Sequence, residues 1–351
     1  MKRCIVTVAL AVCGLPILSG SAGSVPKRPV IEWQGRTMGS PYTVRITGTN
    51  LVGAQIDTLR SEVERSLAEI NRQMSNYQPD SELSRFNRAP DHTPFKVSPE
   101  FARVVRYALD MSSRSAGAFD PTLGPVINLW GFGEPSGKQS APKEAVLLEA
   151  RKRTGWKDLS VTARDELVKV IPDLALDLGA VAKGFGVDEV GRVLRDHGLT
   201  DFYISIAGEV LVRGLNPRGT SWHLGISAPL DHWRQTDPMV AGVWLSDQAL
   251  STSGDYQKFF RDAQGRRLSH LIDPRTSRPV QHDLAAVSVV ATDSMTADAL
   301  GTTLFVLGLD EGLRFIDAWT NAAALFIVRE PDGSFRQVPS ARFAPLARYE
   351  P

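Results

Sequence analysis

Four short apolar segments follow one another in the second half of the chain, at residues 202–206, 209–213, 222–227 and 242–245. Their composition is typical of β-strands, and the stretches between them suit hairpin turns. Strands joined by hairpins run antiparallel, because a parallel pair needs a longer crossover connection. The sequence therefore predicts a meander of antiparallel strands.

Helix-spaced apolar residues occur on both sides of this meander. From residue 56, apolar side chains recur every three or four positions, which predicts an amphipathic helix that ends near Ser75. A second helix is expected from Ser98, with Pro99 at its first position. Further helices are predicted at residues 181–197, 294–307 and 310–319, and further strands at residues 30–47, 174–178, 267–273, 285–291 and 323–328. Antiparallel strands with helices between or beside them indicate an α+β fold.

The charge balance argues against a nucleic-acid partner. The chain has 40 Lys and Arg against 39 Asp and Glu, a net charge of +1, and no basic face follows from that balance. The sequence also lacks the HExxH, CxxC and GxSxG motifs. Zinc-hydrolase and serine-esterase functions therefore lose their usual support.

The first 22 residues are predicted to be a signal peptide, followed by one compact domain over residues 23–351. A basic start and an apolar run precede small residues and a cleavage point after Ala22. We therefore expect an exported, periplasmic protein. Both cysteines, Cys4 and Cys13, lie in the leader, so the mature chain is expected to have no disulfide. The sequence around Cys13 also resembles a lipoprotein cleavage box, which leaves lipid anchoring to the inner membrane as an alternative.

Asp298 and Thr302 are candidates for a metal site. They stand four residues apart in a predicted helix, so the carboxylate and the hydroxyl project from one face. A carboxylate and a neutral oxygen, with the other positions left to water and phosphate, are ligands that Mg²⁺ prefers. Two alternatives remain, a cap or dipole role for Asp298 and a Thr302 hydroxyl bonded back to its own helix.

Residues 177–186, DLGAVAKGFG, are a candidate phosphate site. An apolar strand, a Gly turn and a helix that opens with Lys183 would aim N–H groups and one cation at a phosphate. A solvated Lys183 is the alternative. His270 lies three residues before Asp273, and a histidine oriented by a carboxylate can act as a base, while a structural histidine is the alternative. Together these candidates favour phosphoryl or nucleotidyl chemistry.

Six longer motifs occur in a fixed order along the chain: MSNYQPDSELSRFN, AFDPT, DLGAVAKGFGVD, STSGDYQKFF, HLIDPRTSRPV and TADALGTTLFVLG. Together they closely resemble the ApbE family of FAD:protein FMN transferases, over nearly all of the mature chain. The resemblance implies an exported bacterial enzyme that uses FAD and Mg²⁺ to transfer FMN to a threonine of a target protein, with release of AMP. It also implies an ApbE-like, T-fold-like α+β body, built on an antiparallel sheet with flanking helices.

The resemblance implies roles for particular residues. Asp298 and Thr302 would ligate Mg²⁺ through their side chains, and Ala180 would do so through its backbone carbonyl. His270, assisted by Asp273, would accept the proton of the attacking hydroxyl. The residues expected to contact FAD are Met38, Tyr77, Ala118, Phe119, Asp120, Asp177, Lys183 and Ile272.

The implied acceptors are membrane redox subunits or periplasmic flavoproteins with a short Ser/Thr-containing motif. Lys183 would neutralise phosphate charge as AMP departs. One alternative is an FAD pyrophosphatase that uses water as the nucleophile, and another is a non-enzymatic FAD-binding or carrier protein. Ala207 and Ser277 stand in turns where the family usually has glycine, which leaves the geometry of those loops open.

Overall fold

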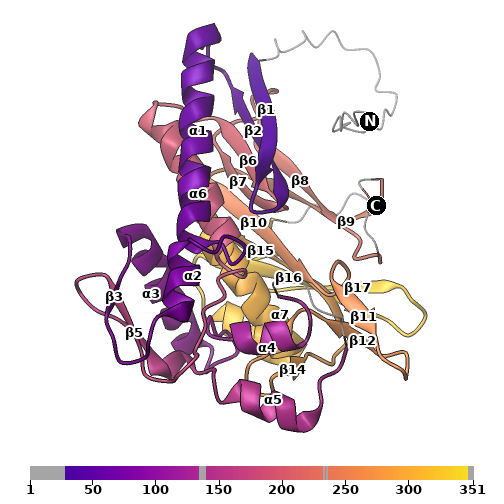
Figure 1. Cartoon of the computed structure of the whole chain (residues 1–351). Helices are drawn as coiled ribbons and strands as arrows, with labels where there is room; N and C mark the ends of the chain where they lie inside the picture. The colour runs from indigo at the N-terminus through magenta and orange to yellow at the C-terminus, as the bar shows by residue number, and fades with distance from the viewer. Residues whose placement is uncertain (1–27, 134–139, 232–233, 235, 347–351) are drawn as a thin grey trace, which may run out of the picture.

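The computed structural model describes residues 28–133, 140–231, 234 and 236–346, so the predicted signal peptide lies outside the described residues. Its main feature is an eight-stranded sheet in the order β1-β2-β6-β7-β10-β15-β16-β17, in which every neighbouring pair is antiparallel (Figure 1). The strands are β1 (Val30–Thr37), β2 (Ser40–Thr47), β6 (Phe202–Ile206), β7 (Glu209–Arg213), β10 (Gln248–Gly254), β15 (Leu284–Ala291), β16 (Ala322–Arg329) and β17 (Phe335–Pro339). The predicted α+β class is confirmed.

The sheet is covered on both faces. Helices α6 (Ala182–Asp196) and α7 (Ser294–Asp317) pack on one face, with α1 (Gly53–Met74) against α6. The hairpin of β8 (Trp222–Ser227) and β9 (Met239–Leu245) lies on the other face (Figure 1). Side chains of β16 alternate between these layers, since Phe326 belongs to the helix-side core while Leu325 and Ile327 belong to the other.

The remaining elements surround one end of this body or lie on the second face. They are α2 (Glu82–Arg88), α3 (Pro99–Arg114), α4 (Gly124–Leu129), α5 (Glu144–Arg151), a 3₁₀ turn (Trp156–Asp158), β3 (Phe95–Lys96), β4 (Leu159–Val161), β5 (Glu166–Lys169), β8 (Trp222–Ser227), β9 (Met239–Leu245), β11 (Phe259–Arg261), β12 (Arg267–Ser269), β13 (Ile272–Asp273) and β14 (Arg278–Pro279). In the described part of the chain, no helix is long and apolar enough to cross a membrane.

The predicted four-strand meander is wrong in part. Only β6 and β7 pair within the main sheet, whereas β8 and β9 form a separate two-stranded sheet. The place next to β7 is taken by β10, a strand of mixed polarity that the sequence pattern did not reveal. The hairpin buries Trp222 and Val243 against the sheet and leaves its outer side chains exposed, so it forms a second layer.

The predicted strand at residues 174–178 is also wrong, because side chains bind its backbone. Lys169 Nζ donates to the carbonyl oxygen of Leu174 at 3.0 Å. The Asn87 amide both accepts from Leu176 N–H, at 2.8 Å, and donates to the Leu176 carbonyl, at 3.0 Å. The only strand-like backbone pairing of this segment in the described residues is an isolated bridge between Ala175 and Leu123. The side-chain bonds otherwise take the place of a neighbouring strand, and they hold an extended segment that leads to α6.

The predicted helices are confirmed. α1, α3 and α6 lie where the apolar spacing placed them, and Gly198, with φ 73°, follows α6 as expected of a C-terminal cap residue. The two helices predicted at residues 294–307 and 310–319 are one assigned helix, α7, interrupted by the non-helical Gly308.

Candidate active site

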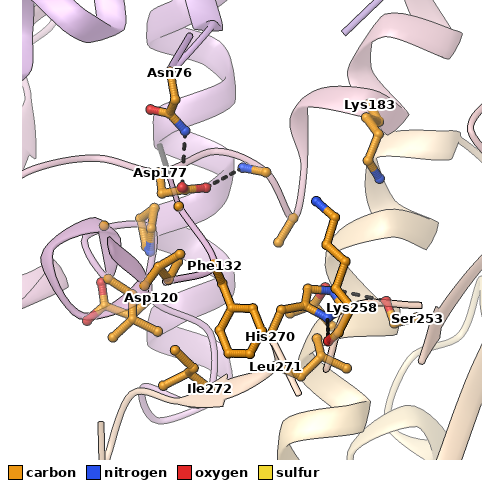
Figure 2. A pocket seen from close by; sticks show the side chains of 18 of the residues that line it. Asn76, Asp120, Phe132, Asp177, Lys183, Ser253, Lys258, His270, Leu271 and Ile272 are labelled. Atoms are coloured by element: carbon orange, nitrogen blue, oxygen red, sulfur yellow. Dashed lines mark hydrogen bonds between the residues drawn. The ribbon is translucent and has the colours of Figure 1, made fainter. Parts of the chain in front are cut away.

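A cavity of about 540 Å³ lies where the segment before α6, the first turns of α7 and the β11–β12 hairpin meet (Figure 2). That volume is within the range of small-molecule and cofactor sites. All but two of the predicted site residues line it: Tyr77, Ala118, Phe119, Asp120, Asp177, Ala180, Lys183, His270, Ile272, Asp298 and Thr302. The exceptions are Met38 and Asp273.

The start of α7 is fixed against α6. Asp188 of α6 accepts hydrogen bonds from the backbone N–H groups of Ser294 and Met295, each at 2.8 Å. Gly184 allows the close contact, because a Cβ there would lie 2.3 Å from the carbonyl oxygen of Ser294. The Gly184 N–H donates to Oδ2 of Asp298 at 3.0 Å. The backbone of α6 therefore positions this carboxylate.

Asp298 and Thr302 bring oxygen ligands to the cavity. Asp298 is only 3% exposed, and the Thr302 hydroxyl lies 3.4 Å from Ser253 Oγ. The hydroxyl of Thr303, one position further on, bonds back to its own helix at 2.7 Å. Back-bonding therefore describes Thr303, and Thr302 presents its hydroxyl at the cavity. Ala180 lines the same cavity, so the predicted oxygen ligands are brought together.

A buried charge cluster supports the fit to a divalent cation. Lys183 forms an ion pair with Glu209, a residue that the sequence analysis did not single out, and Glu209 Oε2 is buried without a hydrogen-bond partner among the described residues. Although burial alone would lower the pKa of Lys183, the carboxylates of Asp298 and Glu209 raise it above its usual value. Burial raises the pKa of Asp298 to about 6, and Lys183 opposes that rise. Two carboxylates against one ammonium leave a negative site of hard oxygens, which suits Mg²⁺.

His270 is held by the backbone of Lys258, the residue just before strand β11. Its Nδ1 atom lies 3.2 Å from the carbonyl oxygen of Lys258. Because a carbonyl can only accept, Nδ1 carries the hydrogen and Nε2 keeps its lone pair. Burial, together with the charge of Lys258, lowers the pKa of His270 to about 4. The ring is therefore neutral near pH 7 and can accept a proton.

Two acidic residues organise the facing loops. Asp177 accepts from Asn76 Nδ2 at 3.0 Å and from Gly179 N–H at 2.8 Å (Figure 2). Asp120 accepts from both the backbone N–H and the hydroxyl of Thr122, at 2.7 and 2.6 Å. Burial raises the pKa of both carboxyl groups. These bonds fix the shape of the wall, and contact with FAD stays a prediction for both residues.

Met38 and Asp273 have other contacts. A Cβ on Gly186 of α6 would lie 2.9 Å from Met38 Cε, so Met38 packs on that helix. The carboxylate of Asp273 accepts from the Arg275 guanidinium at 2.9 and 3.0 Å. The orientation of His270 therefore comes from the Lys258 carbonyl rather than from Asp273.

The two turns that lack the usual glycine keep a left-handed backbone. Ala207 has φ 55° and Ser277 has φ 60°. Non-glycine residues adopt this region at a cost in free energy. Both turns therefore keep the backbone conformation that glycine would adopt, at the cost of local strain.

Comparisons with known proteins show the family of this chain. The family model described as "ApbE family" matches residues 38–326. The FAD:protein FMN transferase of Vibrio cholerae is 37% identical over 93% of this chain and 95% of its own, and that of Haemophilus influenzae is 36% identical over 90% and 91%. Among solved structures, the flavin transferase ApbE from Vibrio cholerae superposes with a TM-score of 0.82 at 36% identity, over 91% of this chain and 99% of that one. The apo flavinyl transferase ApbE of Pseudomonas stutzeri gives 0.82 at 35%, over 91% and 97%.

Proposed function

The chain belongs to the ApbE family and is an FAD:protein FMN transferase, and from this premise we propose that it joins FMN to a threonine hydroxyl, with Mg²⁺ as cofactor and AMP as the second product. One observation carries the proposal. The same cavity contains the oxygen ligands of Asp298 and Thr302 and a neutral His270 with an available ring nitrogen. Metal-assisted group transfer to a hydroxyl needs both.

In the proposed reaction, the threonine oxygen forms a bond to the phosphorus of the FMN half of FAD. The bond from that phosphorus to the bridging oxygen breaks, and the bridging oxygen leaves as part of AMP. Nε2 of His270 accepts the hydroxyl proton. Its ring is already in the required tautomer, because Nδ1 donates to the Lys258 carbonyl.

Asp298 and Thr302 would hold Mg²⁺ through their side chains, and Ala180 would do so through its carbonyl. When bound, the ion supplies positive charge to the phosphate oxygens. Lys183 neutralises part of the charge of the Asp298 and Glu209 carboxylates. This pairing offsets part of the desolvation free energy that burial of the two carboxylates costs.

The flavin end of FAD needs apolar and aromatic surface. Tyr77 exposes 65% of its surface at the cavity, while Phe119 and Ile272 are buried below. An aromatic ring can stack on a flat ligand. We therefore assign the flavin ring of FAD to this end of the cavity and the phosphates to the charged residues around Lys183.

The acceptor is proposed to be a membrane redox subunit or a periplasmic flavoprotein with a Ser/Thr-containing motif. The leader sequence supports export and a periplasmic site of action. N-terminal sequencing of the protein recovered from the periplasm tests this part. An N-terminus at Gly23 agrees with cleavage after Ala22, whereas a lipid-modified Cys13 indicates membrane anchoring.

The reaction is tested with purified protein, FAD, Mg²⁺ and an acceptor domain that the Vibrio cholerae transferase modifies. Intact-mass spectrometry measures the acceptor, and chromatography measures AMP. We expect an acceptor heavier by one FMN and an equal amount of AMP. Both should be lost with Asp298→Ala and after chelation of the metal.

Two other results would overturn the proposal. Free FMN and AMP with an unmodified acceptor would identify an FAD pyrophosphatase. Intact FAD throughout, under conditions where the Vibrio cholerae enzyme modifies the same acceptor, would favour an FAD-binding or carrier protein.

A further inference from the structure

Lys258 is the cation of this cavity that is available to a ligand. It lines the cavity, and within the described residues its ammonium group makes no hydrogen bond or ion pair. The other basic side chains there are engaged. Lys183 is paired with Glu209, and the guanidinium of Arg88 donates to the carbonyl oxygen of Pro79 at 2.7 Å. A ligand with negative charge would therefore find Lys258 unpaired.

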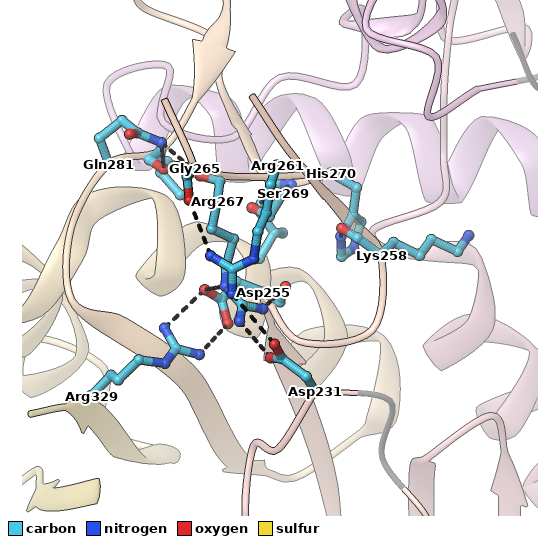
Figure 3. Close-up of polar contacts among 12 residues, drawn as sticks. Asp231, Asp255, Lys258, Arg261, Gly265, Arg267, Ser269, His270, Gln281 and Arg329 are labelled. Carbon is cyan, nitrogen blue, oxygen red and sulfur yellow. Dashed lines mark hydrogen bonds and ion pairs between the residues drawn. The ribbon is translucent and has the colours of Figure 1, made fainter. Parts of the chain in front are cut away.

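The backbone of Lys258 is fixed although its ammonium is not. Its carbonyl oxygen accepts from His270 N–H at 3.0 Å as well as from Nδ1. Three residues earlier, Asp255 accepts from Arg329 at 2.9 and 3.1 Å and lies 3.5 Å from Arg267 Nε (Figure 3). These contacts hold both ends of the β11–β12 hairpin. In Figure 3 the Lys258 side chain extends away from this cluster.

The charge of Lys258 acts on both sides of the cavity. Burial lowers the pKa of His270, and Lys258 lowers it further. Burial raises the pKa of Asp177, and Lys258 opposes that rise. In Figure 2 the side chain extends from the His270 side toward Asp177 and Lys183. Its position therefore lies between the proton acceptor and the proposed phosphate site.

We propose that the Lys258 ammonium binds the phosphate oxygens of FAD and donates a hydrogen bond to the bridging oxygen as that oxygen leaves with AMP. This inference rests on the proposed function. In the transfer step the new bond joins the threonine oxygen to phosphorus, and the electron pair of the broken phosphorus–oxygen bond stays on the bridging oxygen. That oxygen gains negative charge, which a nearby ammonium stabilises. The hydroxyl proton goes to His270, so Lys258 remains protonated.

The test compares two flavins that differ in phosphate. Dissociation constants of FAD and of riboflavin, which has no phosphate, are measured by flavin fluorescence for the wild type and for Lys258→Met. We expect FAD to bind about ten-fold more weakly to the variant, since it loses a charge-assisted hydrogen bond. Riboflavin should bind equally to both, and Lys258→Arg should restore FAD binding. Arg261→Met is the matched control, because it removes a charge from the same hairpin outside this cavity.

Unchanged FAD binding, or equal weakening of FAD and riboflavin, would overturn the inference. The transfer assay with the Vibrio cholerae acceptor then measures the rate of FMN transfer by each variant. A fall of about 10²-fold for Lys258→Met, with recovery in Lys258→Arg, agrees with stabilisation of the leaving oxygen. A wild type that binds FAD through Lys258 but modifies no acceptor would contradict the proposed function and leave the phosphate contact established.

Discussion

The Nδ1 atom of His270 lies 3.2 Å from the backbone carbonyl oxygen of Lys258. The contact uses main-chain atoms of Lys258, so substitution of its side chain leaves the partner of His270 in place. Changes at His270 remove the proton acceptor. Changes at Lys258 act on phosphate charge and, through the lost ammonium charge, on the pKa of His270.

Replacement of His270 by Ala is expected to lower the rate of FMN transfer by about 10²- to 10⁴-fold, the usual contribution of a general base. FAD should still bind, because the contacts assigned to the flavin and phosphates remain. AMP release and flavin fluorescence measure the two effects. Loss of FAD binding would instead make His270 a structural or binding residue.

The rate of FMN transfer should fall only at low pH, so the acidic limb of its pH profile should lie well below about pH 6. Because the pKa of His270 is lowered to about 4, the base is unprotonated above that value. At saturating Mg²⁺, which keeps the Asp298 carboxylate ionised, the rate should hold down to about pH 5. The same shift makes the folded state lose stability as pH falls from about 6.5 toward 4, since the unfolded chain binds the proton first. Circular dichroism at each pH separates unfolding from loss of the base. Lys258→Met should move the limb upward.

Thr302 and Thr303 form a matched pair for the metal site. Thr302→Val removes an oxygen from the cavity and should raise the Mg²⁺ concentration needed for half-maximal transfer by about ten-fold, because ligand number tunes affinity. Thr303→Val removes a hydroxyl that bonds within its own helix and should leave that concentration unchanged. Mg²⁺-dependent thermal stabilisation gives a second readout. Equal effects of the two variants would exclude Thr302 as a ligand.

Glu209→Gln is expected to lower the free energy of unfolding by about 2 kcal/mol, less than for a fully buried pair because the Lys183 side chain is 30% exposed. Urea denaturation measures the change. The exposed pair of Arg60 and Glu64 is the control, and Glu64→Gln should change the value by less than about 0.5 kcal/mol. A similar loss in both variants would mean that burial does not strengthen the Lys183 pair.

Ser277→Gly should raise the free energy of unfolding by about 1 kcal/mol, because glycine accepts a φ of 60° without strain. The substitution also removes a buried hydroxyl that lacks a hydrogen-bond partner in the described residues. Gly198→Ala tests the same strain with the opposite sign and should lower the free energy of unfolding, since Gly198 has φ 73° and an added Cβ would meet no other atom within 4 Å. A destabilised Ser277→Gly protein would show that the hydroxyl contributes more than the strain costs.

Much of the fold could be predicted, because helices α1, α3 and α6 have regular apolar spacing. β10 was missed because QALSTSG has few apolar residues, although it lies in the middle of the sheet. Residues 174–178 were assigned wrongly because an apolar run shows that a segment is buried and not what binds its backbone. Here the partners are the side chain of Lys169, five residues before Leu174, and that of Asn87, which is distant in sequence.

The site residues also fall into those that the sequence revealed and those that it did not. Asp298, Thr302 and Lys183 could be found from local spacing and a family resemblance, and the structure brings them to one cavity. Glu209 had one sequence signal, a single acidic residue at the start of an apolar strand. Lys258 lies in the motif STSGDYQKFF, but the sequence did not single it out, since its role depends on which other cations are already paired.

The β11–β12 hairpin carries Lys258 and His270 at its two ends, while Asp298 and Thr302 belong to α7. The hairpin and α7, which are separate in the sequence, therefore contribute different groups to the same proposed substrate site. A hairpin exchanged between relatives, with Asp255 retained as its anchor, would replace the proton acceptor and the unpaired cation while the metal ligands stay unchanged. Such chimeras would allow proton acceptance and the phosphate contact to be altered without a change in the metal ligands.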